Sequence, residues 1–140
     1  MKSTFSLLAS ALAILTLVGC GTAFGFGGQD RSALARTAVQ NYWNDIGHGK
    51  VKVAYYLMTS GNRQTVTLTQ YGQSMFDFLK GTEGVAATAG NASVNGDQAT
   101  VPVTLRSPKT TIKLHAYQHL FWEDGGWKIS DPNGGLSQIK

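Results

Sequence analysis

Hydrophobic side chains recur every three or four residues along the middle of the chain. This spacing predicts amphipathic helices over 32–47 and 67–81, each with a capping side chain at its start and a glycine at its end. The stretch 50–58 alternates like a strand, but its apolar positions also fit a short helix, which we favour, with 59–61 closing it. The first part of the folded chain is therefore predicted to be helical.

From Val85 onward the hydrophobic period becomes two, which is typical of strands that bury one face. A weak strand over 85–94 leads into the Asn-Gly-Asp sequence at 95–97, a strong hairpin signal because left-handed turn positions favour Asn-Gly. The next strand, 99–106, contains Pro102. Proline has no amide hydrogen to donate, so we expect a sheet edge or a bulge at this residue.

A long strand over 110–123, a tight turn at 124–126 and a last strand over 127–130 complete the predicted sheet. Helices followed by antiparallel strands predict an α+β fold, with the helices packed on one face of a sheet of about four strands. The drier face of the long strand should meet the helices, and it carries Ile112, Leu114, Ala116, Gln118, Leu120 and Trp122.

The N-terminal 19 residues have the pattern of a secretory signal. Lys2 is followed by an apolar run over 5–18, which is too short to span a hydrocarbon core comfortably, since about 20 residues are needed. The run ends in Leu-Val-Gly-Cys at 17–20, and Cys20 is the only cysteine of the chain.

This ending resembles the lipobox of bacterial lipoproteins, in which the cysteine thiol is alkylated by a diacylglycerol and the chain is cut before it. The resemblance implies a signal peptide over 1–19 and a lipid on Cys20 that anchors an exported protein to the outer leaflet of the cell membrane or to the outer membrane. The alternative is an ordinary secretory signal, cut near 21–23, that leaves a soluble protein. Four glycines within 21–29 predict a flexible tether over 20–29, followed by a single domain over 30–140.

Composition narrows the classes of function. The chain has 140 residues, of which 42% are hydrophobic, and one cysteine excludes a disulfide scaffold and a four-cysteine metal site. A formal net charge of +4 is too small for a nucleic-acid footprint, so no nucleic-acid partner is predicted. His115 and His119 would lie ~13 Å apart on a strand, too far to share a metal ion, and we predict neither a metal site nor a cofactor.

Four segments carry a further resemblance: the helical positions 41–43 and 54–57, the hairpin Gly-Asp-x-Ala-x-Val within 94–101, and the closing Asp-Gly-Gly-Trp-Lys-Ile within 121–130. Together they resemble the nuclear transport factor 2-like superfamily, above all its small bacterial lipoproteins of unassigned function. The resemblance implies a cone, in which helices pack in the curve of a bent sheet, often with a pocket at the open end. Members include isomerases, cyclases, dehydratases and non-catalytic binding modules, so the fold does not determine the function.

Gln118 is the polar residue in the middle of the predicted inner face. A buried amide without partners costs roughly 1–3 kcal/mol, so we expect it to meet a tyrosine hydroxyl, a water or a ligand. Aromatic and sulfur side chains that could line the same cavity are Tyr42, Tyr56, Tyr71, Met75, Trp122 and Trp127. The alternative is that these side chains simply fill a core.

The opposite sheet face is a second candidate site. It would be basic and aromatic, a composition that suits a contact with a second copy or with an envelope protein, although it could equally be a solvated surface. Its candidate residues are Arg106, Lys113, His115, Tyr117, His119, Phe121 and Lys128.

Catalysis has the least support. An isomerase-type site would need a carboxylate shielded in the pocket, but Asp77 lies off the apolar stripe and we expect it to be exposed. No other acid sits within an apolar pattern, and we predict no catalytic residue. The sequence thus predicts a lipid-anchored binding or interaction module, with a carrier of a small apolar ligand as the runner-up and an isomerase- or cyclase-like enzyme as the third reading.

Overall fold

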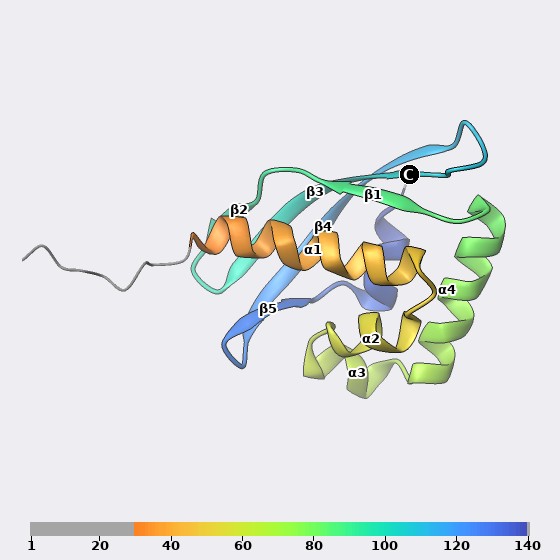
Figure 1. Ribbon diagram of the computed structural model, residues 1–140. Helices are drawn as coiled ribbons and strands as arrows, with labels where there is room; N and C mark the ends of the chain where they lie inside the picture. Colours follow the sequence, from red (N-terminus) through yellow and green to blue (C-terminus); the bar gives the residue numbers. More distant parts are fainter. Residues whose placement is uncertain (1–29, 140) are drawn as a thin grey trace, which may run out of the picture.

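The computed structural model describes residues 30–139, which form an α+β domain (Figure 1). Helices come first and the strands follow, as predicted. The helices are α1 (Arg31–Gly47), α2 (Val51–Tyr56), α3 (Ser60–Thr65) and α4 (Leu68–Thr82). The strands are β1 (Ala86–Ala89), β2 (Ser93–Asn95), β3 (Gln98–Arg106), β4 (Lys113–Glu123) and β5 (Gly126–Ile129), and a 3-10 segment, η1 (Pro132–Gln138), ends the described chain.

The sheet is antiparallel and strongly curled, so it forms a half-barrel around the helices. Its strand order is β1-β3-β4-β5. Strand β2 pairs with the same edge of β3 as β1 does, but at the opposite end of that edge. Helix α1 crosses the concave face, and Gln40 ties it to β1 by donating to the Ala87 carbonyl (2.9 Å) and accepting from the Ala89 amide (3.0 Å). The predicted α+β cone-like layout is confirmed.

The core lies between α1 and the concave face of the sheet. Side chains from one stripe of α1 pack against alternate residues of β3 and β4, which is the match between helical and strand periods that the sequence predicts. On α1 these side chains are Ala35, Val39, Tyr42, Trp43 and Ile46, and on β3 they are Ala99, Val101, Val103 and Leu105.

The predicted break at Pro102 lies opposite the gap between β1 and β2. These two strands pair with β3 on either side of Pro102, and Gly90 in the gap donates its amide to the Pro102 carbonyl (2.7 Å). A Cβ atom on Gly90 would lie 2.8 Å from the proline ring, so the close approach requires glycine. The single weak strand predicted over 85–94 is therefore two short strands.

Helix α1 ends at Gly47 as predicted, but without a left-handed conformation; the residue is glycine because a Cβ atom there would lie 2.6 Å from the Val85 carbonyl oxygen. Two other predicted helix boundaries are wrong. Helix α4 continues through Gly81, and Glu83 takes the left-handed conformation instead. Ser60 starts α3 rather than closing α2, with Thr59 as its N-cap.

Ile112, predicted to lie on the dry face, is another correction. It precedes β4, in the loop between β3 and β4, and its side chain is 39% exposed. The burial pattern within β4 follows the predicted alternation from Leu114 to Leu120.

Candidate functional site

Gln118 lies on the concave face of β4 and is only 1% exposed. Its Oε1 accepts a hydrogen bond from Trp43 Nε1 (3.0 Å), and its Nε2 donates to Asp131 Oδ2 (2.7 Å) and to the Gly134 carbonyl (3.2 Å). No tyrosine hydroxyl is among these partners, so the expectation of a tyrosine partner is wrong. The protein itself satisfies this amide with an indole, a carboxylate and a main-chain carbonyl.

Asp131 is a buried carboxylate that the sequence analysis missed. It is 4% exposed, and the same Oδ2 that meets Gln118 also accepts from the His119 amide (2.7 Å). Burial raises the pKa of the Asp131 carboxyl above its usual value, and the hydrogen bond from the His119 amide partly opposes that rise. No periodic pattern marks this residue, since it follows the last strand and precedes a proline.

A pair of tyrosine hydroxyls lies beside this network. Tyr71 donates to the Tyr42 hydroxyl oxygen (2.8 Å), and both side chains are fully buried, as is Met75. Burial raises the pKa of Tyr42 and of Tyr71 well above that of a solvated tyrosine. Both phenols therefore stay protonated and uncharged near neutral pH.

The segment η1 closes the open end of the cone over these groups. Gly134 and Gly135 are buried and have positive φ angles of 66° and 87°. A Cβ atom on Gly134 would overlap the Tyr42 hydroxyl, and one on Gly135 would lie 2.6 Å from Gln118 Nε2. The two glycines thus let the main chain pack directly onto the polar groups of the interior, where the sequence alone suggested a pocket.

The six side chains predicted to line a cavity with Gln118 do not lie together. Tyr42, Tyr71 and Met75 surround the closed end of the cone, but Tyr56 is 50% exposed and packs against Tyr55 and the Arg63 guanidinium, so its placement in the cone is corrected. The remaining two, Trp122 and Trp127, pack edge to face at the opposite end of the domain, where α1 begins.

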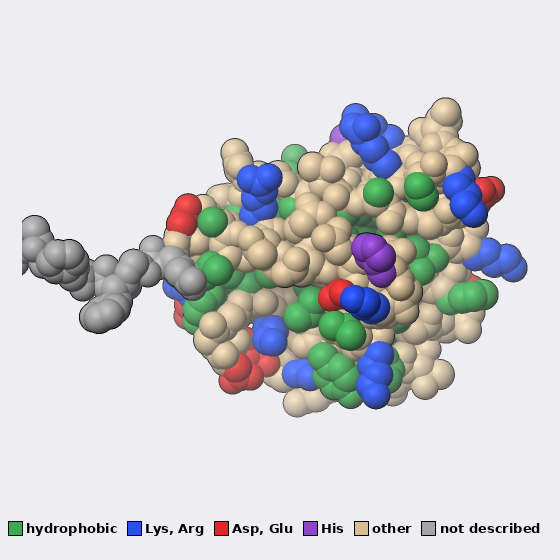
Figure 2. Space-filling view, in the orientation of Figure 1, with side chains coloured by type: hydrophobic (Ala, Val, Ile, Leu, Met, Phe, Trp, Pro, Cys, Tyr) green, Lys and Arg blue, Asp and Glu red, His purple; other side chains and the backbone are tan. Residues whose placement is uncertain are grey.

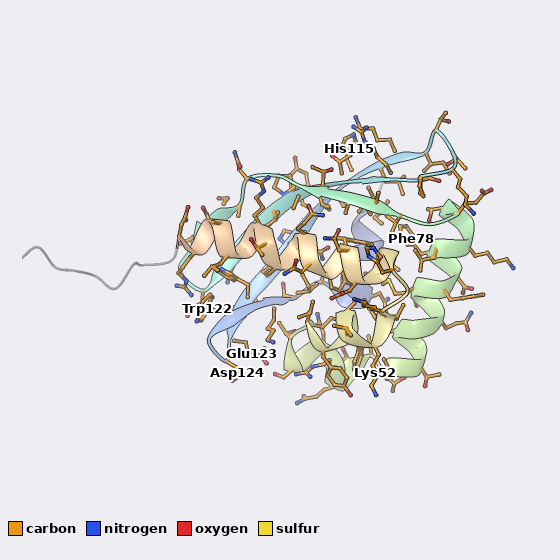
Figure 3. All side chains as sticks on the ribbon, viewed as in Figure 1. Lys52, Phe78, His115, Trp122, Glu123 and Asp124 are labelled. Carbon is orange, nitrogen blue, oxygen red and sulfur yellow. The ribbon has the colours of Figure 1, made fainter. Side chains whose placement is uncertain are left out.

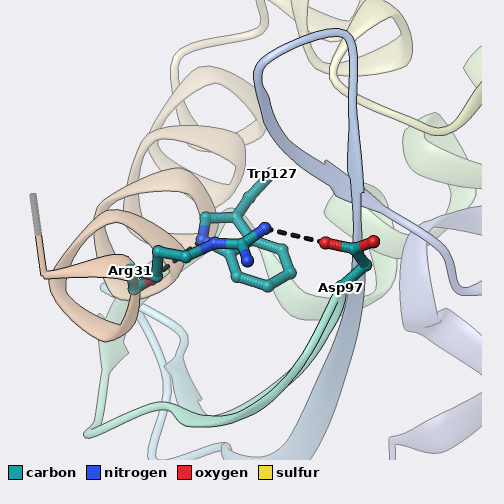
Figure 4. A network of polar contacts seen from close by, with 3 residues as sticks. All are labelled: Arg31, Asp97 and Trp127. Atoms are coloured by element: carbon teal, nitrogen blue, oxygen red, sulfur yellow. Dashed lines mark hydrogen bonds and ion pairs between the residues drawn. The ribbon is translucent and has the colours of Figure 1, made fainter. Parts of the chain in front are cut away.

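Arg31, the first residue of α1, joins these two tryptophans to the β2–β3 turn, and Figure 4 shows it between Trp127 and Asp97. Its guanidinium lies 4.3 Å from the Trp122 ring and 5.1 Å from the Trp127 ring, and it pairs with Asp97 Oδ1 at 3.0 Å. Trp127 Nε1 donates to the Arg31 carbonyl (2.8 Å). These contacts hold the point at which the chain enters the domain.

The convex face of the sheet, called here the outer sheet face, carries the second set of candidates. Tyr117 pairs with Pro102 across β3 and β4 at its centre and is 64% exposed. On either side lies a threonine–histidine pair, each with a Thr Oγ1 to His Nδ1 distance of 3.2 Å. These pairs are Thr100 with His119 and Thr104 with His115, and Figure 3 shows His115 on the side of the sheet away from the helices.

Basic side chains border this face. Arg106 pairs with Lys113 at one end of β3 and β4, and Lys128 pairs with Phe121, which is 44% exposed, at the other end. The alternation predicted for β4, together with its register against β3 and β5, thus brings all seven interface candidates to one surface. Within residues 30–139, no three His, Cys, Asp or Glu side chains group closely enough to hold a metal ion.

Cys20, the predicted signal peptide over 1–19 and the predicted tether lie outside the described residues. Of the described helices, none has the length and apolar character that crossing a membrane requires. The chain matches no protein-family model, and no curated protein matches its sequence.

Proposed function

We propose that this protein is a lipid-anchored interaction module of the cell envelope, without catalytic activity, that binds its partner through the outer sheet face. The curled sheet around α1 supports the suggested membership of the nuclear transport factor 2-like superfamily, as does the order of helices before strands. The leader sequence that ends at Cys20 supports the anchor.

The observation that carries this proposal is the contrast between the two faces of β4. Its inner face is closed by the chain itself, because Gln118 has protein partners for both its oxygen and its nitrogen. Its outer face presents Tyr117 and Phe121 to solvent. Tyrosine and phenylalanine are enriched in protein interfaces because they contribute a large apolar area with few rotatable bonds.

The charges on this face favour an acidic protein surface as the partner. The cations Arg106, Lys113 and Lys128 lie around the exposed aromatic side chains. The carboxylate of β4, Glu123, lies at the end of that strand and accepts a hydrogen bond from the Ser60 amide (3.0 Å). A second copy of the chain would bring the same three cations toward each other, which is unfavourable. A homodimer is therefore the outcome that the test must separate from an acidic partner.

The test compares Tyr117→Ala with Tyr56→Ala, because both tyrosines are at least half exposed but only Tyr117 lies on the outer sheet face. We expect Tyr117→Ala, and also Lys113→Glu, to abolish chemical cross-linking to an acidic envelope protein in intact cells, with thermal stability nearly unchanged. Tyr56→Ala should cross-link like the wild type. Equal loss in both tyrosine variants, or cross-links between copies of this chain alone, would reject the proposed partner.

The anchor has its own test. Cells that express the protein are labelled with radioactive palmitate, and a Cys20→Ser variant is the control. We expect only the wild type to carry label, and only the wild type to be found in the membrane fraction. A protein that carries no label and is found in the soluble fraction would instead support the ordinary secretory signal.

A small-molecule site in the cone is the second candidate, as a carrier of a small apolar ligand or as an isomerase- or cyclase-like enzyme. The buried carboxylate of Asp131 beside Gln118 favours the enzyme, because an isomerase-type site needs a shielded carboxylate. Entry to this site requires η1 to move, because Gly134 and Gly135 occupy the space next to Tyr42 and Gln118. Native mass spectrometry of protein taken from its own host tests this candidate. A bound small molecule that survives Tyr117→Ala would support the carrier over the interaction module.

A further inference from the structure

An apolar groove lies at the end of the domain where α1 begins. One wall is a stripe of α1 that contains Leu34 and Ala38, the other is the β4–β5 hairpin with Trp122 and Trp127, and Leu57 lies between them. Its volume is about 320 Å³. Figure 2 shows hydrophobic side chains at this end of the molecule, and Figure 3 shows Trp122 beside the start of α1.

The described residues leave the groove unfilled. The side chains of Leu34, Ala38, Leu57 and Trp122 are each partly exposed, whereas Trp127 is buried and holds the Arg31 carbonyl. Four partly exposed apolar side chains line this groove. They favour an apolar occupant, because removing apolar surface from contact with water is favourable.

The chain that precedes α1 supplies a matching occupant. Residues 21–29 contain two phenylalanines, Phe24 and Phe26, which are two positions apart and so project to the same side of an extended chain. From Arg31 an extended chain reaches about 17 Å back to Phe26 and about 24 Å to Phe24, at up to ~3.4 Å per residue. The stripe from Leu34 to Asn41 extends only ~10 Å along α1, so both aromatic rings can reach it.

We propose that Phe24 and Phe26 dock in this groove and hold the predicted tether against the domain. The short connection gives the two rings an effective concentration on the order of millimolar, so that even weak apolar contacts populate the docked state. The glycines at positions 25, 27 and 28 allow the chain to reverse direction before it enters α1. The site is an intramolecular one, distinct from the outer sheet face.

Docking restricts how the anchored domain is oriented at the membrane. This restriction rests on the proposed lipidation of Cys20, whereas the docking itself does not. With Phe24 held in the groove, three residues lie between Cys20 and Phe24, so the two are at most ~14 Å apart along the chain. The α1 end of the domain is then held close to the membrane, and the domain presents the outer sheet face in a restricted set of orientations.

Chymotrypsin cleaves after phenylalanine in exposed chain, so the rate of cleavage after Phe24 or Phe26 reports the undocked fraction. The assay uses the protein as its host cell processes it, in isolated membranes and in the soluble fraction, with products identified by mass. Leu34→Ala and Trp122→Ala remove opposite walls of the groove, and Val53→Ala, an exposed apolar residue of α2, is the matched control. Thermal melts show which variants remain folded, and either groove variant alone suffices.

We expect both groove variants to be cut roughly tenfold faster than the wild type, a factor that corresponds to about 1.4 kcal/mol at 25 °C, and Val53→Ala to be cut at the wild-type rate. Equal rates in all four proteins would overturn the proposal. Protection that disappears on tenfold dilution would also overturn it, because the occupant would then be a second copy. Failure of the anchor alone would appear as protein in the soluble fraction with the same order of rates.

Discussion

Asp131 offers the sharpest test of how the interior is held together. Its Oδ2 accepts two hydrogen bonds of 2.7 Å, from Gln118 Nε2 and from the His119 amide. Asp131→Ala removes both, which leaves the His119 amide without its acceptor and Gln118 Nε2 with only the longer bond to the Gly134 carbonyl. Since each orphaned buried donor costs about 1–3 kcal/mol, we expect Asp131→Ala to lower the free energy of unfolding by about 2–4 kcal/mol.

Asp131→Asn separates the hydrogen bonds from the charge. An amide oxygen in the place of Oδ2 can accept from the same two donors, so the network keeps its geometry. Because both donors meet one oxygen, the new amide group replaces the oxygen that makes no hydrogen bond to the described residues. We therefore expect Asp131→Asn to cost less than half of what Asp131→Ala costs, about 1 kcal/mol at neutral pH.

The two variants also differ in their pH dependence. Burial raises the pKa of Asp131 from its ordinary value of 3.8, so between that value and the raised pKa the native state binds more protons than the unfolded state. The contribution of this carboxyl to stability is thus fully present below pH 3.8 and is lost as the pH rises through the raised pKa. Asp131→Asn removes this slope, so its stability relative to the wild type improves as the pH rises from 3.8 through the raised pKa of Asp131.

Urea unfolding followed by tryptophan fluorescence measures these differences, with wild type and both variants compared at each pH. Taking the difference between proteins cancels the titration of the other carboxylates. Equal losses for Asp131→Ala and Asp131→Asn would refute the role of the shared acceptor oxygen. A relative stability of Asp131→Asn that falls with rising pH would refute the upward direction of the pKa shift.

Two further predictions concern the closed end of the cone. In urea unfolding, Gly135→Ala should lower the free energy of unfolding by about 2–4 kcal/mol, because residue 135 has a positive φ and its new Cβ atom would lie 2.6 Å from Gln118 Nε2. Gly125→Ala is the control, since Gly125 has a positive φ but open space around it, and it should cost only about 1–2 kcal/mol. Tyr42 and Tyr71 have raised pKa values in the folded state, so their contribution to stability is present below about pH 10 and is lost above it. Ultraviolet titration should therefore show these two tyrosines ionising only as the protein unfolds.

The features of the fold that could be predicted are those specified by neighbouring residues. The capping box at the start of α4 is made by Thr67 and Gln70, three residues apart, and both of its hydrogen bonds are present. The Asp124-Gly125 turn joins β4 to β5, where the Asp-Gly-Gly sequence at 124–126 predicts a tight turn, and both residues have positive φ. In such segments, the residues that the cap or turn geometry requires are also compatible with the burial pattern of the flanking helix or strands.

Segments without a hydrophobic period could not be predicted. Helix α3 buries none of its residues, so no apolar stripe marks it. The η1 segment consists largely of Asn, Gly and Ser and would ordinarily indicate a loop; its two buried glycines are explained only by their distance to Tyr42 and Gln118. The sequence could therefore identify Gln118 as a buried amide, but it could not identify the partners that η1 and Asp131 supply.

The residues that β4 contributes to the outer sheet face were easier to predict because they follow from the strand period alone. A period of two places every second side chain of β4 on the same face once one of them is known to be buried. What the period cannot supply is the neighbouring strand. The register that brings Thr100 to His119 and Thr104 to His115 depends on the β3–β4 connection, which is a loop of several residues and not a two-residue turn.

The closed interior also limits which ligand the cone could accept. Displacing η1 would remove the Gly134 carbonyl from Gln118 Nε2 and leave the Tyr42–Tyr71 hydroxyl pair facing the vacated space. A purely apolar ligand would fill that space but would leave the amide donor with one partner fewer, at a cost of roughly 1–3 kcal/mol. A partner that binds the outer sheet face displaces only water, because Tyr117 and Phe121 are already exposed. The hydrogen bonds of the interior therefore favour binding at the convex face over binding inside the cone.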